Sequence, residues 1–310
     1  MATVGTDFNL MDIAQNIGGS QPVLVDAVAS RNYGQLFRIL PMKQITGWVE
    51  RINRVTSYPT VSFRNLGEYV TPSKGETQAV QEGVFLLSGA SKIDKIKAER
   101  DPRGLTAARA GQDNLFLKAM GRSLSYQTLY GDYADGKQYD GLFNRLPATA
   151  DTFVSAGGSA EKYSIYALRF GEDQFMGTYN LGIEGELIEA NPYGPYLDKD
   201  GSGNLNELYA TFFNAAIGLS QYSTKSIGRI GKIDSSNKPT VADFYSLFEK
   251  MDGMPDVLVC NWTVAGYISD LKDGKLQMGP GDRNYDVAVD FFDGIPIVVD
   301  TAVSTDESAV

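Results

Sequence analysis

Apolar residues recur at steps of three or four between residues 101 and 131, the longest such stretch in the chain. This period places Leu105, Ala108, Phe116, Met120 and Leu124 on one face of a helix, and Gln112 interrupts the row. At about 1.5 Å per residue the helix would span on the order of 40 Å. We expect three residues to mark its ends: Asp101 as cap, Pro102 in the first turn and a left-handed Gly131. Three glycines inside the stretch predict a kink or a late start: Gly104, Gly111 and Gly121.

Residues 48–84 have a different pattern, because both faces of the predicted strands carry charge. Residues 48–55 are rich in strand formers, and in residues 60–64 Val61 and Phe63 alternate with polar residues. A long hairpin that is polar on both faces buries little within its own subunit and usually needs a partner surface. An ordinary solvated edge hairpin is the alternative. Candidate subunit contacts are Trp48, Arg51, Arg54, Arg64, Glu68, Lys74 and Glu76.

The second half of the chain mixes strands and helices, which predicts an α+β fold. Residues 163–170, 175–181 and 208–219 are rich in aromatic and aliphatic strand formers. Thr240 caps a helix that ends near Gly253, and Asn261 caps a second over residues 262–271. The first of these helices has an apolar face of Val241, Phe244, Leu247, Phe248 and Met251. Strands are expected at residues 256–260 and within residues 290–300.

The remaining segments are predicted to be short elements or connections. Two short helices are expected at residues 7–17 and 27–40. Ser91 opens a capping-box pattern with Asp94, which predicts a short helix before residue 101. Residues 131–144 form a turn-rich loop, and residues 147–162 are small and polar, as in a linker.

Composition narrows the possible chemistry. The chain of 310 residues contains no histidine, which excludes histidine-dependent triads and metal sites, and its single cysteine, Cys260, lies in an apolar strand pattern. The formal charge of −10 disfavours tight binding of nucleic acid by the surface as a whole. Because no stretch resembles a membrane span or a signal peptide, we expect the chain to act in a cytosol. We expect no cofactor.

Two acidic segments are candidates for chemistry. Asp198, Asp200 and Asn204 fit the start of a calcium loop, but Tyr209 stands where a bidentate glutamate should close it. The tip of a β-hairpin explains the same residues and is the preferred interpretation. The acidic residues Glu184, Glu186 and Glu189 suggest the paired carboxylates of a hydrolase. The alternative, a solvated strand edge, is the preferred interpretation.

Four stretches in order carry a family resemblance. They are residues 58–74, residues 92–96, residues 129–142 around the end of the long helix, and residues 164–171. Over residues 36–232 their order and spacing resemble the major capsid proteins of tailed bacteriophages, which share the Hong Kong 97 phage capsid fold. The resemblance is strongest to coat proteins of short-tailed Bordetella-phage-like viruses.

The resemblance implies a domain plan and a function. Residues 1–47 would form an N-terminal arm with short helices, residues 48–84 the extended loop over a neighbouring subunit, residues 85–150 the peripheral domain with its spine helix, and residues 151–310 mainly the axial domain. The protein would form pentamers and hexamers of an icosahedral shell around double-stranded DNA, in virions assembled in a bacterial cytoplasm. Expected partners are a portal, a scaffolding protein and a decoration (cement) protein. An encapsulin-like nanocompartment shell and a carboxylate-based hydrolase are the alternatives.

Overall fold

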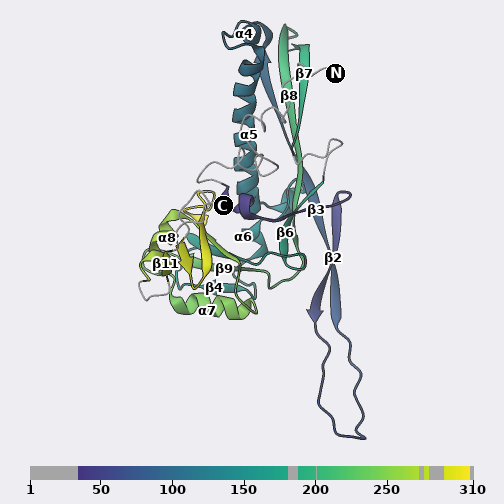
Figure 1. Ribbon diagram of the computed structural model, residues 1–310, viewed down its shortest axis with the longest axis vertical. Coiled ribbons are helices and arrows are strands. Elements are labelled where there is room, and N and C mark those ends of the chain that lie inside the picture. Colours follow the sequence, from purple (N-terminus) through teal and green to yellow (C-terminus); the bar gives the residue numbers. More distant parts are fainter. Residues whose placement is uncertain (1–33, 181–187, 200, 272–275, 279–289, 308–310) are drawn as a thin grey trace, which may run out of the picture.

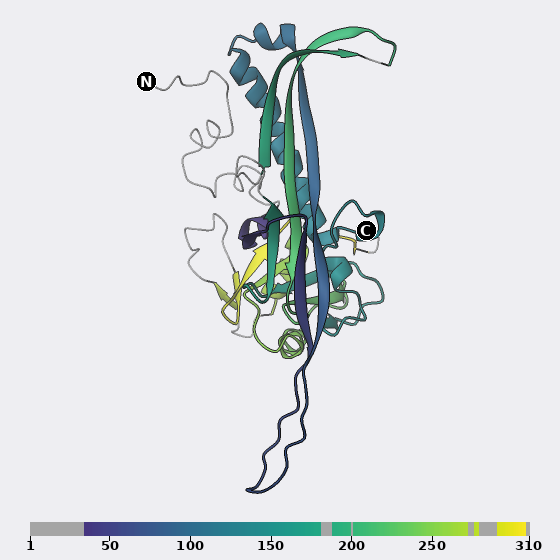
Figure 2. The same cartoon turned by 90° about the vertical axis from the view of Figure 1, so that its right-hand side faces the viewer.

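A computed structural model of the chain describes residues 34–180, 188–199, 201–271, 276–278 and 290–307. Figure 1 shows an elongated molecule in which helix α5 (Leu105–Tyr130) lies beside the long strands β3 (Glu76–Asp94) and β8 (Leu205–Gln221). A second sheet with its helices lies beside one half of this unit. A hairpin projects far beyond the rest of the molecule, which a view from the side confirms (Figure 2).

The predicted long helix is present as α5, and its buried face agrees with the sequence pattern. Ala108, Met120 and Leu124 are buried, while Phe116 is half-buried and stacks on Phe213 of β8. The pattern missed Leu117, which is 2% exposed. The helix begins at Leu105 after Gly104, so Asp101 and Pro102 lie outside it.

The predicted left-handed end of this helix is wrong, although the helix does end at Gly131. Gly131 has φ −54° and ψ 141°, an extended conformation that any residue can adopt. A glycine is needed there because the backbone of residues 139–141 folds back and packs against it. Gly141 donates its N–H to the Gly131 carbonyl at 2.8 Å. A side chain at Gly131 would run into the backbone carbonyls of Tyr139 and Gln127.

The first sheet has the order β1-β6-β8-β3-β2, and β7 pairs with β8 along the same edge as β6. Its shorter strands are β1 (Met42–Gln44), β2 (Val49–Ser57), β6 (Phe175–Asn180) and β7 (Ile188–Lys199). Strand β3 pairs with β2 over its first half and with β8 over its second, from Val84↔Gly218 to Asp94↔Leu208. The sheet therefore runs from the hairpin to the far end of α5.

The second sheet has seven strands in the order β11-β12-β13-β10-β5-β9-β4. They are β4 (Phe153–Ser155), β5 (Tyr163–Leu168), β9 (Ile227–Ile233), β10 (Val257–Cys260), β11 (Leu276–Met278), β12 (Asp290–Phe292) and β13 (Ile295–Val299). Helices α7 (Val241–Lys250) and α8 (Trp262–Ser269) begin at the predicted caps, Thr240 and Asn261. Phe244, Leu247 and Met251 pack under this sheet, which confirms the predicted face.

Strand β5 joins the second sheet and its helices to the unit formed by α5 and the first sheet, because its two faces pack into different apolar cores. Ile165 and Ala167 face the cluster beneath α7 and α8, whereas Tyr166 and Leu168 face a larger core shared with α5 and the first sheet. Because successive side chains of a strand point to opposite faces, one strand serves both cores. Helix α3 (Gln35–Ile39) closes the larger core, and Asp300 accepts the N–H groups of Gly34 and Leu36 at its start.

Several sequence predictions need correction. The short helix α4 (Lys95–Glu99) is capped by Asp94, because Ser91 belongs to β3 and its hydroxyl bonds Asp113 of α5. The segment read as a loop contains η1 (Tyr133–Asp135) and α6 (Leu142–Arg145), and the predicted linker contains β4. The helix expected at residues 7–17 and the first half of that expected at residues 27–40 lie outside the described residues, and the second half of the latter contains α3. None of the described helices is long and apolar enough to cross a membrane.

The range assigned mainly to an axial domain, residues 151–310, is divided between the two sheets. Strands β6 to β8 come from this range yet belong to the first sheet, in which β8 pairs with β3 and also with β6 and β7. The reason is that β8 is long enough to pair with all of the second half of β3, a non-local pairing that the sequence pattern does not encode.

Candidate subunit interface

The hairpin of residues 48–84 divides into a paired root and an unpaired loop. Strands β2 and β3 pair from Val49↔Gly83 to Ser57↔Glu76. Residues 58–75 then form a loop without regular strands, so the strand predicted at residues 60–64 is absent. Strands need a partner for their backbone groups, and Pro59 and Pro72 also lack the N–H that a ladder uses. The loop therefore extends without support from its own subunit.

Large apolar side chains cover this loop and are open to solvent. Val61 is 89% exposed, and Phe63, Leu66 and Tyr69 are fully exposed. Every residue from 57 to 79 with a described side chain is exposed. Burial of one such side chain is worth about 1.5–3 kcal/mol, and a group of exposed apolar side chains on a projecting loop is typical of a contact surface. The contact residues predicted from the sequence are Trp48 and six charged residues, and they do not include Leu66 and Tyr69, although large apolar residues without a core periodicity were a visible signal.

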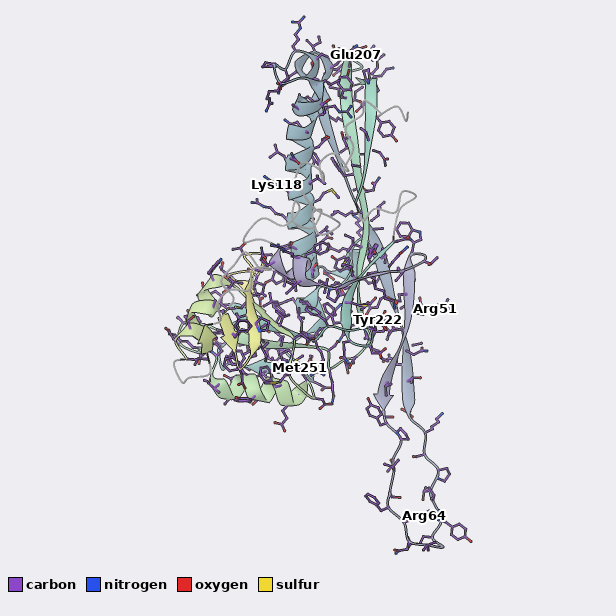
Figure 3. All side chains as sticks on the ribbon, in the orientation of Figure 1. Arg51, Arg64, Lys118, Glu207, Tyr222 and Met251 are labelled. Carbon is purple, nitrogen blue, oxygen red and sulfur yellow. The ribbon has the colours of Figure 1, made fainter. Side chains whose placement is uncertain are left out.

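The tip of the loop holds two of the predicted contact residues together. Arg64 donates to the carbonyl of Glu68 at 2.8 Å, and the Glu68 carboxylate accepts the N–H of Asn65 at 2.8 Å. Asn65 donates to this carboxylate from its backbone N–H and from its side-chain amide, and these two bonds lower the pKa of Glu68. Gly67 has φ +92°, a conformation that favours glycine, and so permits the turn. Arg64 lies at the end of the hairpin farthest from the body (Figure 3).

The predicted contact residues of the strands fall into two groups. Trp48 is 55% exposed, and Arg51, Lys74 and Glu76 are also exposed and available to a partner. Arg54 instead points to its own subunit, where it donates to Glu82 at 2.7 Å and to the Gln221 carbonyl at 2.7 Å. Residues 51 and 54 point to opposite faces of a strand, but the sequence pattern did not show which of these faces packs against the body.

The calcium-like segment lies at the tip of the hairpin formed by β7 and β8, where Asp198 pairs with Asn206. The Asp198 carboxylate accepts a 2.7 Å bond from Lys92, which lowers its pKa. Tyr209, at the position of the closing acid, bonds Glu99 at 3.0 Å and packs beside the α4–α5 junction. Asn204 lies in the turn, and Asp200 lies outside the described residues. Within the described part of the chain, no three metal-binding side chains gather.

The structure does not describe the side chains on which the hypothesis of paired carboxylates depends. Glu184 and Glu186 lie outside the described residues. Glu189 belongs to β7, and only its backbone, which pairs with Asn214 of β8, is described.

Comparisons with known proteins agree with this architecture. The family model of the major capsid protein GP7 matches residues 46–310. The capsid structure of bacteriophage Epsilon15 matches with a TM-score of 0.58 at 20% identity and covers 99% of both chains. The capsid structure of bacteriophage JBD30 has a TM-score of 0.55 at 11% identity and covers 97% of this chain and 99% of that one. No curated protein sequence matches the chain.

Proposed function

Because the chain belongs to the major capsid protein GP7 family, it is a coat protein of a phage head shell, and we propose that its hairpin holds a neighbouring subunit in that shell. The fold is the α+β fold of Hong Kong 97-like capsids. The single observation that carries the proposal is the exposed apolar loop of residues 58–75, which extends beyond the body of its own subunit.

The energetics of the loop favour contact with a second copy. Burying Phe63, Leu66 and Tyr69 against a neighbour would contribute several kcal/mol per subunit, by the scale of about 1.5–3 kcal/mol per large apolar side chain. Exposed charges such as Arg51 and Arg64 would add at most about 1 kcal/mol for each pair. In a closed symmetric shell every subunit repeats the same contact, so these terms are multiplied.

The wider assembly follows from the same proposal. Subunits would form pentamers and hexamers and enclose double-stranded DNA without sequence specificity, and the net charge of −10 would keep DNA from adhering to the wall. Portal, scaffolding and decoration proteins would be the partners, and assembly would take place in the host cytoplasm. We retain the domain division at residues 47, 84 and 150 as a proposal, with β6 to β8 added to the peripheral part.

The role is structural rather than enzymatic. Membership in a capsid family favours the coat protein over the nanocompartment and hydrolase alternatives. The stronger likeness to coat proteins of Bordetella-phage-like viruses remains a prediction, supported by the four stretches of sequence.

Substitution of the loop's apolar residues tests the proposal. Phe63→Ser, Leu66→Ser and Tyr69→Ser together should leave the circular dichroism spectrum and melt unchanged, because these side chains touch solvent in the subunit. Sedimentation and negative-stain microscopy should show loss of shells and capsomers. Leu115→Ser, which changes a 60% exposed leucine on α5, serves as the matched control and should assemble. Normal shells from the triple variant would refute the proposed contact.

A further inference from the structure

Two glutamates face each other directly across the root of the hairpin. Glu50 of β2 is the register partner of Glu82 of β3, and their side chains are only 12% and 11% exposed. Like charges at opposed positions destabilise a strand pair, and partial burial strengthens the repulsion. The hairpin therefore contains an unfavourable pair, and most of the compensation comes from the rest of the subunit.

The charge of Glu50 is compensated from β1 and from the end of β8. Its carboxylate accepts bonds from Lys43 at 2.8 Å, from Tyr222 at 2.6 Å and from Ser220 at 2.7 Å. None of these donors belongs to the hairpin. Figure 3 shows Tyr222 close to the root, on the same level as Arg51.

The charge of Glu82 is compensated chiefly from α6. Arg145 binds both oxygens of the carboxylate at 2.8 Å, a bidentate geometry that fixes direction as well as distance. Arg54 adds a third bond at 2.7 Å, and its Nε donates to the carbonyl of Gln221. The Arg145 guanidinium also lies 3.4 Å from the carbonyl of Leu219.

These contacts attach the root to one place on the body, residues 219–222 at the end of β8, with α6 and β1 beside it. Glu50 and Glu82 are the two anchors of the root. Among the described side chains of β2, only that of Ile52, 3% exposed, is apolar and buried. One anchor lies on β2 and the other on β3, so together they constrain both strands and hence the direction of the hairpin.

We propose that Glu50 and Glu82 are positioning residues that aim the hairpin at its neighbour. The inference rests on the proposed function, because it assumes that the loop contacts another subunit. The chain from Glu50 to Leu66 can reach roughly 50 Å at about 3.3 Å per residue. A tilt of about 10° at the root would move the tip by about 9 Å, twice the range of a side-chain contact.

Spin-label distances in the full-length subunit, kept below the concentration for assembly, test the aiming directly. One label is placed at Thr77→Cys on the exposed side of β3 and the other at Ala119→Cys on α5, while buried Cys260 stays unlabelled. Thr77 lies in the paired part of β3, so its label reports the direction of the hairpin rather than movement of the loop. The unchanged root should give one narrow distance distribution.

Variants of the root should change that distribution without unfolding the subunit. Glu50→Gln with Glu82→Gln keeps side-chain shape but removes the charges that the body binds, and the distribution should broaden or shift by several ångströms. Glu76→Gln, an exposed glutamate on the same strand, is the matched control and should leave it unchanged. A distribution identical to the wild type in the double variant would overturn the inference.

A charge swap supplies a rescue. Lys43→Glu or Glu50→Lys alone should disturb the distance distribution and shell formation, and the two together should restore both. Restoration is expected because the hydroxyls of Ser220 and Tyr222 can donate or accept. Failure of the paired swap to restore the distribution in a folded subunit would contradict the aiming role.

The two proposals fail in different ways. If the Glu50→Gln, Glu82→Gln variant loses the hairpin direction but still forms normal shells, the aiming stands and the proposed contact of the loop is wrong. If it keeps the direction but loses shells, the aiming is wrong and the loop contact is unaffected.

Discussion

The carboxylate of Glu307 lies 2.9 Å from the guanidinium of Arg229, and neither side chain is more than 1% exposed. Glu307 also accepts bonds from Tyr130, the last residue of α5, and from Tyr166 of β5, both at 2.8 Å. Arg229 further packs over the ring of Phe143 at 4.3 Å. The C-terminal segment therefore joins the end of the long helix to the second sheet.

We predict that Glu307→Ala destabilises the subunit by about 3–5 kcal/mol, because it leaves the buried charge of Arg229 without its fully buried partner. Urea denaturation measures the loss. Glu249→Ala, an exposed acid on α7, is the control and should change the free energy of unfolding by less than about 0.5 kcal/mol. Similar losses in the two variants would show that Glu307 does not hold this junction.

Charge reversal should separate the assembly role of the hairpin from its stability. Arg51→Glu with Arg64→Glu changes exposed side chains and should leave the melt unchanged while it prevents shell formation in sedimentation. Arg54→Glu should cost about 2–3 kcal/mol in the subunit itself, because it places a carboxylate beside Glu82. Normal assembly of the Arg51, Arg64 variant would remove these charges from the proposed contact.

The bond between Lys43 and Glu50 should contribute more stability near neutral pH than in acid. Burial opposes the charged form of Glu50, but bonds from Lys43, Tyr222 and Ser220 outweigh it and lower the pKa below the ordinary 4.5. A lowered pKa gives stability that is present above the ordinary value and is lost as the pH falls through the folded-state value. Lys43→Met should therefore cost about 1 kcal/mol at pH 7 and less at pH 3. Urea melts at both values check this, and an equal cost at both would contradict it.

Cys260 should be inert in the folded subunit. It is fully buried in β10, and burial raises the pKa of its thiol to about 12, so the reactive thiolate is scarce at pH 8. We expect a disulfide reagent to modify it only after unfolding in urea, whereas a cysteine introduced at exposed Ala119 should react at once. Rapid modification of native Cys260 would mean that β10 opens readily.

Calcium should not stabilise the subunit through the β7–β8 tip. Asp198 is already bonded to Lys92, and Tyr209 takes the place of the closing acid. The melting temperature of the wild type and of Asp198→Ala should be the same in calcium and in a chelator. A calcium-dependent rise in the wild type that Asp198→Ala abolishes would establish a metal site there.

Local patterns in the sequence determined the long helix α5 and the N-caps of α7 and α8. The apolar face of α5 and the caps Thr240 and Asn261 were all predicted. These features depend on residues three or four positions apart, which the sequence states directly. The lack of one-sided apolar pattern in residues 48–84 likewise predicted a hairpin with little support from its own core.

Features that depend on distant partners were decided by the tertiary structure. The short strand β4 forms because it pairs with the parallel strand β9, which lies more than seventy residues away in the sequence. A glycine is required at position 131 because the backbone of Gly141 packs against it. Arg51 and Arg54 point to opposite faces of β2, and only the packing of the folded chain decides that the face of Arg54 meets the body while that of Arg51 meets solvent. The facing of Glu50 and Glu82 needs one hairpin register, and the pairing of Arg229 with Glu307 joins residues 78 positions apart. Sequence periodicity reports which face of an element is apolar, but only packing decides which charges meet.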